Sequence, residues 1–190
     1  MDILKNFLIQ FTDIPDHDIE TLKSLADRQT FNKGDFFVRA GNRADQMGFL
    51  LNGVTRVYEI KGGKEVTNYF NTTERNPVVT SFKSFLNGAV STEYVEAIET
   101  VEMLVISKTD LERVFESSHA FERLGRKLAE YHYLKAMERI DSLQVASAGL
   151  RYESFLKMYP GLINRIPHHY IASWLGITPE SLSRIRKGGS

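Results

Sequence analysis

Apolar positions recur at helical spacing near the start of the chain and again after residue 107, with a long stretch of different character between them. Over residues 3–27, apolar side chains three and four apart predict short helices. Over residues 30–106, short apolar runs alternate with polar side chains at period two, as at Val101, Met103 and Val105. This alternation is typical of half-buried strands.

Turn signals separate the predicted strands. Asn52-Gly53 and Gly62-Gly63 lie between apolar runs, and both pairs suit hairpin turns whose residues need φ > 0. Residues 81–86 predict one or two helical turns inside this region. Several strands at short spacing predict an antiparallel sandwich or barrel. The fold class expected from the whole chain is α+β, with an N-terminal antiparallel β-roll (jelly-roll-like) flanked by helices.

A long helix is predicted over residues 120–147, roughly 40 Å in length at 1.5 Å per residue. Its apolar positions follow spacings of three and four: Phe121, Leu124, Leu128, Tyr131, Leu134 and Met137. This stripe either packs on the β domain of its own chain or meets a second copy of the same helix. We predict the second arrangement, a dimerisation helix with these six side chains in the interface.

The last forty residues predict a small helical unit. A helix over residues 150–159 precedes Pro160-Gly161, and two shorter helices lie on either side of Gly176 within residues 167–187. Thr178 suits the N-cap of the last helix, and the residue after it is a proline, which suits the first helical position. This layout indicates a DNA-binding helix-turn-helix, and the alternative is an ordinary corner between two helices.

Polar side chains are left on the outer face of the last predicted helix. With Leu182 and Ile185 turned inward, the outward set, together with the cap, is Thr178, Glu180, Ser181, Ser183, Arg184 and Lys187. Glu180 and Arg184 are four residues apart, so they could pair with each other. They could instead face the major groove, where Arg commonly binds guanine and a carboxylate can accept from cytosine.

Composition narrows the possible functions. The chain has 190 residues, 42% hydrophobic and 25% charged, with no net charge. Residues 151–190 hold six basic and two acidic side chains, so this part carries +4 and residues 1–150 carry −4. Such an asymmetry suits a phosphate-binding module beside an acidic body.

Several classes of site and location are not expected. Without cysteine there are no disulfides, thiolate zinc sites or iron–sulfur clusters. None of the five histidines lies within residues 30–106, which argues against a cupin-like metal enzyme. No phosphate-binding glycine motif, long apolar run or signal peptide is evident. We therefore expect a cytoplasmic protein that is not an enzyme and has no cofactor, no metal and no membrane contact.

The order of β-roll, long helix and helix-turn-helix resembles the Crp–Fnr family of bacterial transcription regulators. The segment IASWLGITPESLSRIRK is close to the recognition segment of the branch common in Bacteroidetes-type bacteria, and glycines 34, 41 and 53 match β-roll turns of the family. The resemblance implies an effector domain at 1–118, a dimerisation helix at 119–147 and a DNA-binding domain at 148–190. It also implies that Glu180 and Arg184 contact base edges and that Ser181 and Lys187 contact the DNA backbone.

Two departures from the family pattern affect function. Members that bind cyclic AMP use a Glu for the ribose and an Arg-Ser pair for the phosphate, and Ser81, Ser91 and Thr92 stand at those positions here. A buried phosphate without a cation lacks charge-assisted hydrogen bonds, so we expect no cyclic AMP binding. The candidate effector pocket is then Ser81, Phe82, Ser91 and Thr92. In addition, only residues 188–190 follow the last helix, where the family has a β-hairpin wing.

The sequence thus predicts a dimeric, sequence-specific DNA-binding regulator with an effector-sensing β-roll. Its expected partners are double-stranded DNA, a second copy of itself and a small-molecule effector, with RNA polymerase as a further candidate. The alternative is a ligand-sensing or protein-interaction module that does not bind DNA.

Overall fold

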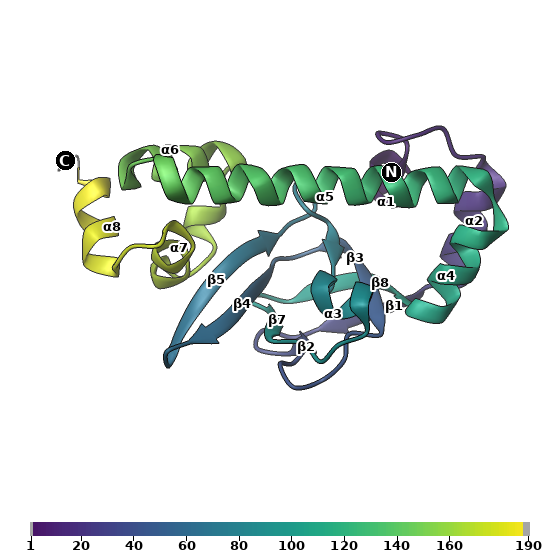
Figure 1. Cartoon of the computed structure of the whole chain (residues 1–190), viewed down its shortest axis with the longest axis horizontal. Coiled ribbons are helices and arrows are strands. Elements are labelled where there is room, and N and C mark those ends of the chain that lie inside the picture. The colour runs from purple at the N-terminus through teal and green to yellow at the C-terminus, as the bar shows by residue number, and fades with distance from the viewer. Residues whose placement is uncertain (1, 188–190) are drawn as a thin grey trace.

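The computed structural model describes residues 2–187 of the chain, with two helices leading into a β-roll and five α-helices and one 3-10 turn after it (Figure 1). The helices before and within the β-roll are α1 (Ile3–Leu8), α2 (Asp16–Ser24) and α3 (Phe82–Asn87). The strands are β1 (Asp27–Phe31), β2 (Phe36–Val38), β3 (Gln46–Asn52), β4 (Thr55–Lys61), β5 (Lys64–Asn71), β6 (Val78–Val79), β7 (Glu93–Ala97) and β8 (Val101–Ser107). After the β-roll come α4 (Lys108–Ser117), α5 (His119–Val145), α6 (Ala148–Met158), the 3-10 turn η1 (Leu162–Asn164), α7 (His168–Leu175) and α8 (Pro179–Arg186).

The strands form two four-stranded antiparallel sheets, in the orders β1-β8-β3-β6 and β2-β7-β4-β5. This arrangement confirms the predicted antiparallel β-roll with flanking helices and a long helix. The Gly62-Gly63 pair makes the predicted hairpin between β4 and β5, with φ values of 57° and 75°. The short helix predicted at residues 81–86 forms as α3. The helices predicted over the last forty residues also form, as α6, α7 and α8.

The turn at Asn52-Gly53 differs from the prediction. Gly53 has φ 93°, as a tight turn requires, but the strands on either side of it lie in different sheets, so it is no hairpin. A Cβ on Gly53 would lie 2.5 Å from the Thr100 carbonyl oxygen. The glycine therefore lets the chain pass from one sheet to the other in close contact with the backbone before β8.

Two separate cores hold the fold together. The first fills the β-roll between the sheets and extends to the N-terminal helices, α4 and the start of α5. The second joins the outer face of the β4–β5 sheet to the C-terminal helices, and its buried members include Val54, Phe70, Phe155, Trp174 and Leu175. The C-terminal helices are thus packed onto the β-roll and lie at one end of α5 (Figure 1).

The apolar stripe predicted for the long helix divides between two environments. α5 spans 27 residues. Phe121 and Leu124 are buried in the first core, and Leu128 is half-buried against it. The prediction that these side chains lie in a dimer interface is therefore wrong for Phe121 and Leu124, which pack within their own chain. Leu134 and Met137, in contrast, are 59% and 39% exposed.

The change of environment follows from helix geometry. From Leu128 to Met137 the apolar positions are always three residues apart. Three residues of an α-helix turn about 300°, so each successive apolar side chain points about 60° away from the previous one. Three such steps carry the stripe to the opposite side of the helix. Within residues 2–187, no helix is long and apolar enough to cross a bilayer.

Candidate nucleic-acid interface and effector site

The last two helices form the corner that the sequence predicts. α7 ends at Gly176, which has φ 68°, and the Thr178 hydroxyl accepts a hydrogen bond of 3.2 Å from the Ser181 backbone N–H at the start of α8. Leu175 and Leu182 are fully buried, which fixes the two helices against each other. These local features arise from a residue that tolerates φ > 0 and a hydroxyl N-cap.

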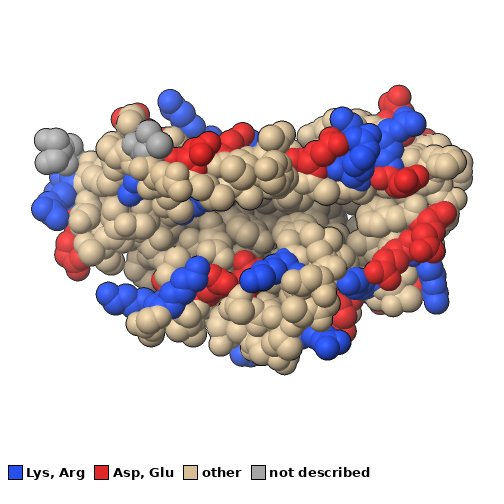
Figure 2. All heavy atoms as spheres, viewed as in Figure 1, with Lys and Arg blue, Asp and Glu red and all other residues tan. Residues whose placement is uncertain are grey.

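The predicted DNA-contacting side chains lie together on the outer surface of α8 and at its cap. Thr178, Glu180, Ser183, Arg184 and Lys187 are exposed, and Ser181, the sixth of the set, is half-buried. Arg184 Nη2 lies 3.3 Å from Ser181 Oγ. Figure 2 shows that the α8 end of the molecule carries Lys and Arg side chains with acidic ones beside them.

Glu180 and Arg184 form no ion pair in the described part of the chain. The pKa of Glu180 is lowered, first by a hydrogen bond from its own backbone N–H and next by the Thr178 hydroxyl. The carboxylate therefore interacts with the N-terminus of α8 and remains charged, while the Arg184 guanidinium is available to a partner. The alternative that the two side chains simply pair with each other does not apply to this structure.

Two arginines that sequence analysis missed bind backbone carbonyls at the corner between α7 and α8. Arg139 of α5 donates to the Trp174 carbonyl, and its guanidinium carbon lies 4.0 Å from the centre of the Trp174 ring. Arg151 of α6 donates through Nε to the Leu175 carbonyl at 2.9 Å. Both cations satisfy carbonyls at the C-terminal end of α7, where positive charge is favoured. Burial lowers the pKa of Arg139 to about 10, so it remains protonated at neutral pH.

The serines and threonine of the candidate effector pocket do come together, but around carboxylates. Ser81 donates to Glu93 Oε2 at 2.7 Å, and Ser91 Oγ lies 3.0 Å from Ser81 Oγ. Thr92 donates to Glu59 Oε1 at 2.7 Å. Ser81 and Ser91 are both almost fully buried.

Amide and ammonium groups complete this polar cluster. Asn68 Nδ2 donates to Glu93 Oε1 at 3.0 Å, and Lys61 Nζ lies 2.6 Å from Glu59 Oε2. The pKa of Glu59 is lowered by hydrogen bonds from Lys61 and then Thr92. A phosphate entering between these serines would therefore meet the carboxylate of Glu93. Sequence analysis missed Glu59 and Glu93, although period two in β4 and β7 places both on the inner face of the sheet.

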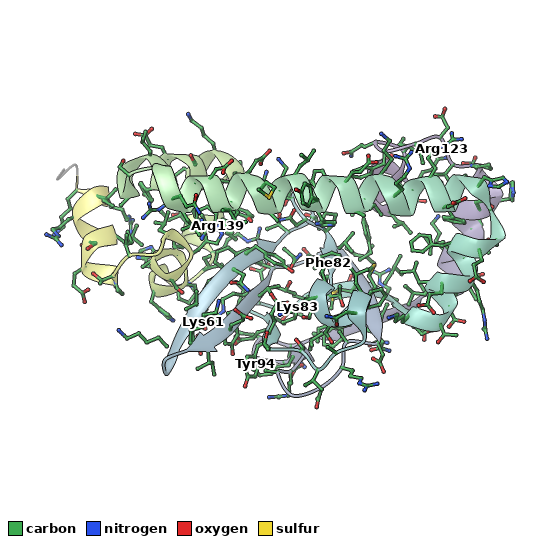
Figure 3. All side chains as sticks on the ribbon, viewed as in Figure 1. Lys61, Phe82, Lys83, Tyr94, Arg123 and Arg139 are labelled. Carbon is green, nitrogen blue, oxygen red and sulfur yellow. The ribbon has the colours of Figure 1, made fainter. Side chains whose placement is uncertain are left out.

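Phe82 stands apart from the other three predicted pocket residues. Its ring contacts His132 of α5 at a centroid distance of 4.4 Å, so it links α3 to the long helix (Figure 3). Burial lowers the pKa of His132. A separate cavity of about 290 Å³ lies between α1, the loop before β6 and Tyr131, and none of the predicted pocket residues lines it.

No group of three or more metal-ligating side chains is found within the described residues 2–187. The position expected for a wing, residues 188–190, lies outside the residues that the structure describes. The domain boundaries predicted at 118 and 147 stay predictions, although the first core crosses the boundary at 118 and the second core joins residues before 118 to residues after 147.

Comparison with known proteins matches residues 28–118 to the family described as cyclic nucleotide-binding domain. No curated protein sequence matches the chain. Among solved structures, the c-di-GMP responsive global regulator CLP of Xanthomonas campestris is similar, with TM-score 0.69, 15% identity and coverage of 92% of this chain and 91% of that one.

Two further structures cover nearly all of the chain. A transcriptional regulator of the Crp/Fnr family from Eubacterium rectale has TM-score 0.70 and 17% identity, with 93% of this chain and 83% of that one covered. The catabolite activator protein of Thermus thermophilus has TM-score 0.59 and 19% identity, with coverage of 94% and 84%. At these identities the similarity establishes the shared fold, and the Bacteroidetes-type branch stays a prediction.

Proposed function

The chain carries a cyclic nucleotide-binding domain at residues 28–118 and has the fold of the Crp/Fnr transcriptional regulators, and from this premise we propose that it is a dimeric, sequence-specific DNA-binding regulator. The observation that carries the proposal is the surface of α8. Its buried side packs on α7 through Leu182, and its exposed side presents Arg184 and Lys187 to solvent. This activity is non-enzymatic and belongs in the cytoplasm with DNA and RNA polymerase.

The proposed dimer uses the second half of α5. Tyr133, Leu134, Met137, Ile140 and Leu143 are all between 39% and 65% exposed, although each is large and apolar. Exposed apolar patches of this kind mark interaction sites. Pairing this face about a two-fold axis would present two α8 helices to major grooves one helical turn apart, about 34 Å.

Each side chain of the α8 surface then has a distinct role. Arg184 donates two parallel hydrogen bonds to a guanine edge, and Glu180 accepts from a cytosine amino group. Ser181, Ser183 and Lys187 contact the phosphate backbone, while Thr178 remains the helix cap. Base contacts set the sequence preference, and phosphate contacts supply affinity common to all sequences.

A mobility-shift titration with DNA from upstream of its own and neighbouring genes tests this proposal. Arg184→Ala should cost about 1–3 kcal/mol at the preferred sequence and relax the preference at one base position. Lys187→Ala should weaken binding to all sequences alike and reduce the salt slope by about 1. Lys33→Ala, an exposed lysine in the loop between β1 and β2, is the control of equal charge and should leave binding unchanged.

The same mobility-shift titration can also contradict the proposal. If no fragment is retarded even at low salt, where counterion release most favours DNA binding, the DNA-binding proposal is wrong. The alternative, a ligand-sensing or protein-interaction module without DNA binding, would then take its place.

We further propose that the β-roll senses an effector through the polar cluster of Ser81, Ser91 and Thr92 with Glu59 and Glu93. The arrangement favours a ligand that donates hydrogen bonds over one that brings a phosphate, because the inner face of β4 and β7 presents two carboxylates. A contact with RNA polymerase stays a prediction.

A further inference from the structure

A fully buried cation, Arg56, lies beside the second core, between the β-roll and the C-terminal helices. The Arg56 side chain on β4 is 1% exposed. Its Nη2 lies 2.6 Å from Glu65 Oε2 on β5 and 3.2 Å from Glu96 Oε2 on β7. One guanidinium thus ties three neighbouring strands of the sheet together.

The same guanidinium is held between two aromatic rings, one from each part of the protein. The Arg56 guanidinium carbon lies 3.8 Å from the centre of the Tyr58 ring on β4 and 3.6 Å from the centre of the Tyr170 ring on α7. Cation–π contacts at these distances are favourable, and more so when water is excluded. Arg56 therefore joins the sheet to the first helix of the helix-turn-helix.

A second contact fixes α7 against the edge of the same sheet. Ser173 Oγ accepts from the Thr67 backbone N–H at 2.9 Å and donates to the Glu65 carbonyl at 2.9 Å. Because β5 is an edge strand, these backbone groups have no neighbouring strand to bond with. Ser173 is three residues after Tyr170, so both lie on one side of α7, and together they fix its position and its rotation.

The strands that hold α7 also carry the polar cluster of the candidate effector site. On β4, Arg56 and Glu59 are three residues apart and lie on opposite faces. On β7, Glu93 and Glu96 have the same relationship. A ligand that displaces either strand at the inner face must therefore move Arg56, which contacts α7, or Glu96, which pairs with Arg56 at the outer face.

The choice of side chain supports a role in positioning. A planar guanidinium can stack on two rings and bond two carboxylates at once, which an ammonium group cannot do. Yet Nε and Nη1 of Arg56 find no hydrogen-bond partner among the described residues. A buried cation with unsatisfied donors is a costly way to add stability, whereas it specifies one arrangement of the groups around it.

We propose that Arg56 is the positioning residue that sets the orientation of α7 and α8 on the β-roll, and that an effector acts on α8 by shifting the strands that hold this arginine. The inference rests on the proposed function, because α8 is the proposed DNA-contacting helix. It adds the route by which the sensing sheet controls that helix.

Distances between spin labels on the free protein test the proposal without DNA. The chain has no cysteine, so Lys33→Cys on the β-roll and Ser183→Cys on α8 give two unique labelling sites, both exposed. Labelled protein is mixed with an excess of unlabelled protein so that pairs within one chain dominate. Arg56→Lys and, separately, Ser173→Ala should each broaden the distance distribution at least twofold.

Arg28→Lys is the matched control, because Arg28 pairs with Glu102 in the other sheet and its side chain is 65% exposed. It should leave the distribution unchanged. An unaltered width and mean in a folded Arg56→Lys variant would overturn the proposal, whatever Ser173→Ala shows. If Arg56→Lys fails to fold by circular dichroism, Ser173→Ala decides alone. Broadening in a protein that binds no DNA fragment would uphold the positioning role and reject the DNA-binding function.

Discussion

Replacing Met137 and Ile140 by glutamate should separate the proposed dimer into monomers. The two side chains lie one turn apart on the exposed apolar face of α5 and are 39% and 45% exposed in the single chain. In a two-fold pairing of this face, the double variant places four carboxylates where four apolar side chains were in contact. The buried half of α5, which packs on the β-roll, is not altered.

The size of the effect follows from the exposed fractions. Full burial of a Met or Ile side chain contributes about 1.5–3 kcal/mol. Covering the exposed two-fifths therefore contributes about 0.6–1.3 kcal/mol for each side chain, and about 2.5–5 kcal/mol for the four in a dimer. At 1.4 kcal/mol for each factor of ten, the dimer dissociation constant should rise by about 60- to 4,000-fold, before any repulsion between the carboxylates.

Sedimentation velocity over a range of protein concentrations measures this change directly. Ile9→Glu with Leu25→Glu is the matched control, since these side chains near the N-terminus are 46% and 40% exposed and lie away from the second half of α5. The control should dimerise like the parent protein. A dissociation constant that is equal in the Met137–Ile140 variant and the parent, or a parent that is monomeric throughout, would refute the interface.

Two further predictions concern the β-roll and the long helix α5 that packs on it. Cyclic AMP and cyclic GMP should leave the melting temperature unchanged in a thermal-shift assay, because their phosphate would face Glu93; a clear rise with either nucleotide would contradict this. His132 should make stability depend on pH. Burial lowers its pKa, so below the ordinary value of about 6.5 the unfolded chain binds a proton that the folded chain does not, and the free energy of unfolding falls with falling pH. Urea denaturation at pH 7.5 and 5.5 should show a smaller fall for His132→Leu, and equal falls would count against the reasoning.

Local patterns in the sequence were sufficient for the elements and for the α8 surface. Period two predicted the strands, and Gly176 with Thr178 predicted the corner, because in each case the deciding interaction lies within a few residues. The Asn52-Gly53 turn shows the limit of prediction from local patterns. A glycine with φ > 0 suits a hairpin and a passage between sheets equally, and only the pairing of distant strands distinguishes them.

Contacts between distant segments could not be predicted in the same way. Period two puts Val54, Arg56 and Tyr58 on one face of a strand, and an arginine in a strand is ordinarily exposed. Its burial depends on Tyr170, more than a hundred residues later in the chain. The same holds for Arg139 and Arg151, whose partners are backbone carbonyls and leave no signature in the sequence.

Because the apolar stripe rotates around α5, different sides of this helix face the β-roll, the end of α7 and, in the proposed dimer, a second copy. Its first half buries Phe121 and Leu124 in the β-roll, and its second half turns Met137 and Ile140 outward. In that second half, the side facing the rest of the chain carries Arg139, which bonds to the end of α7. Because Arg139 and Ile140 are neighbours on one helix, a change in how two α5 helices pair in the proposed dimer would move the corner that presents α8. Arg56 contacts the same corner from the sheet, so under the two proposals the orientation of α8 depends on both the α5 pairing and the β-roll.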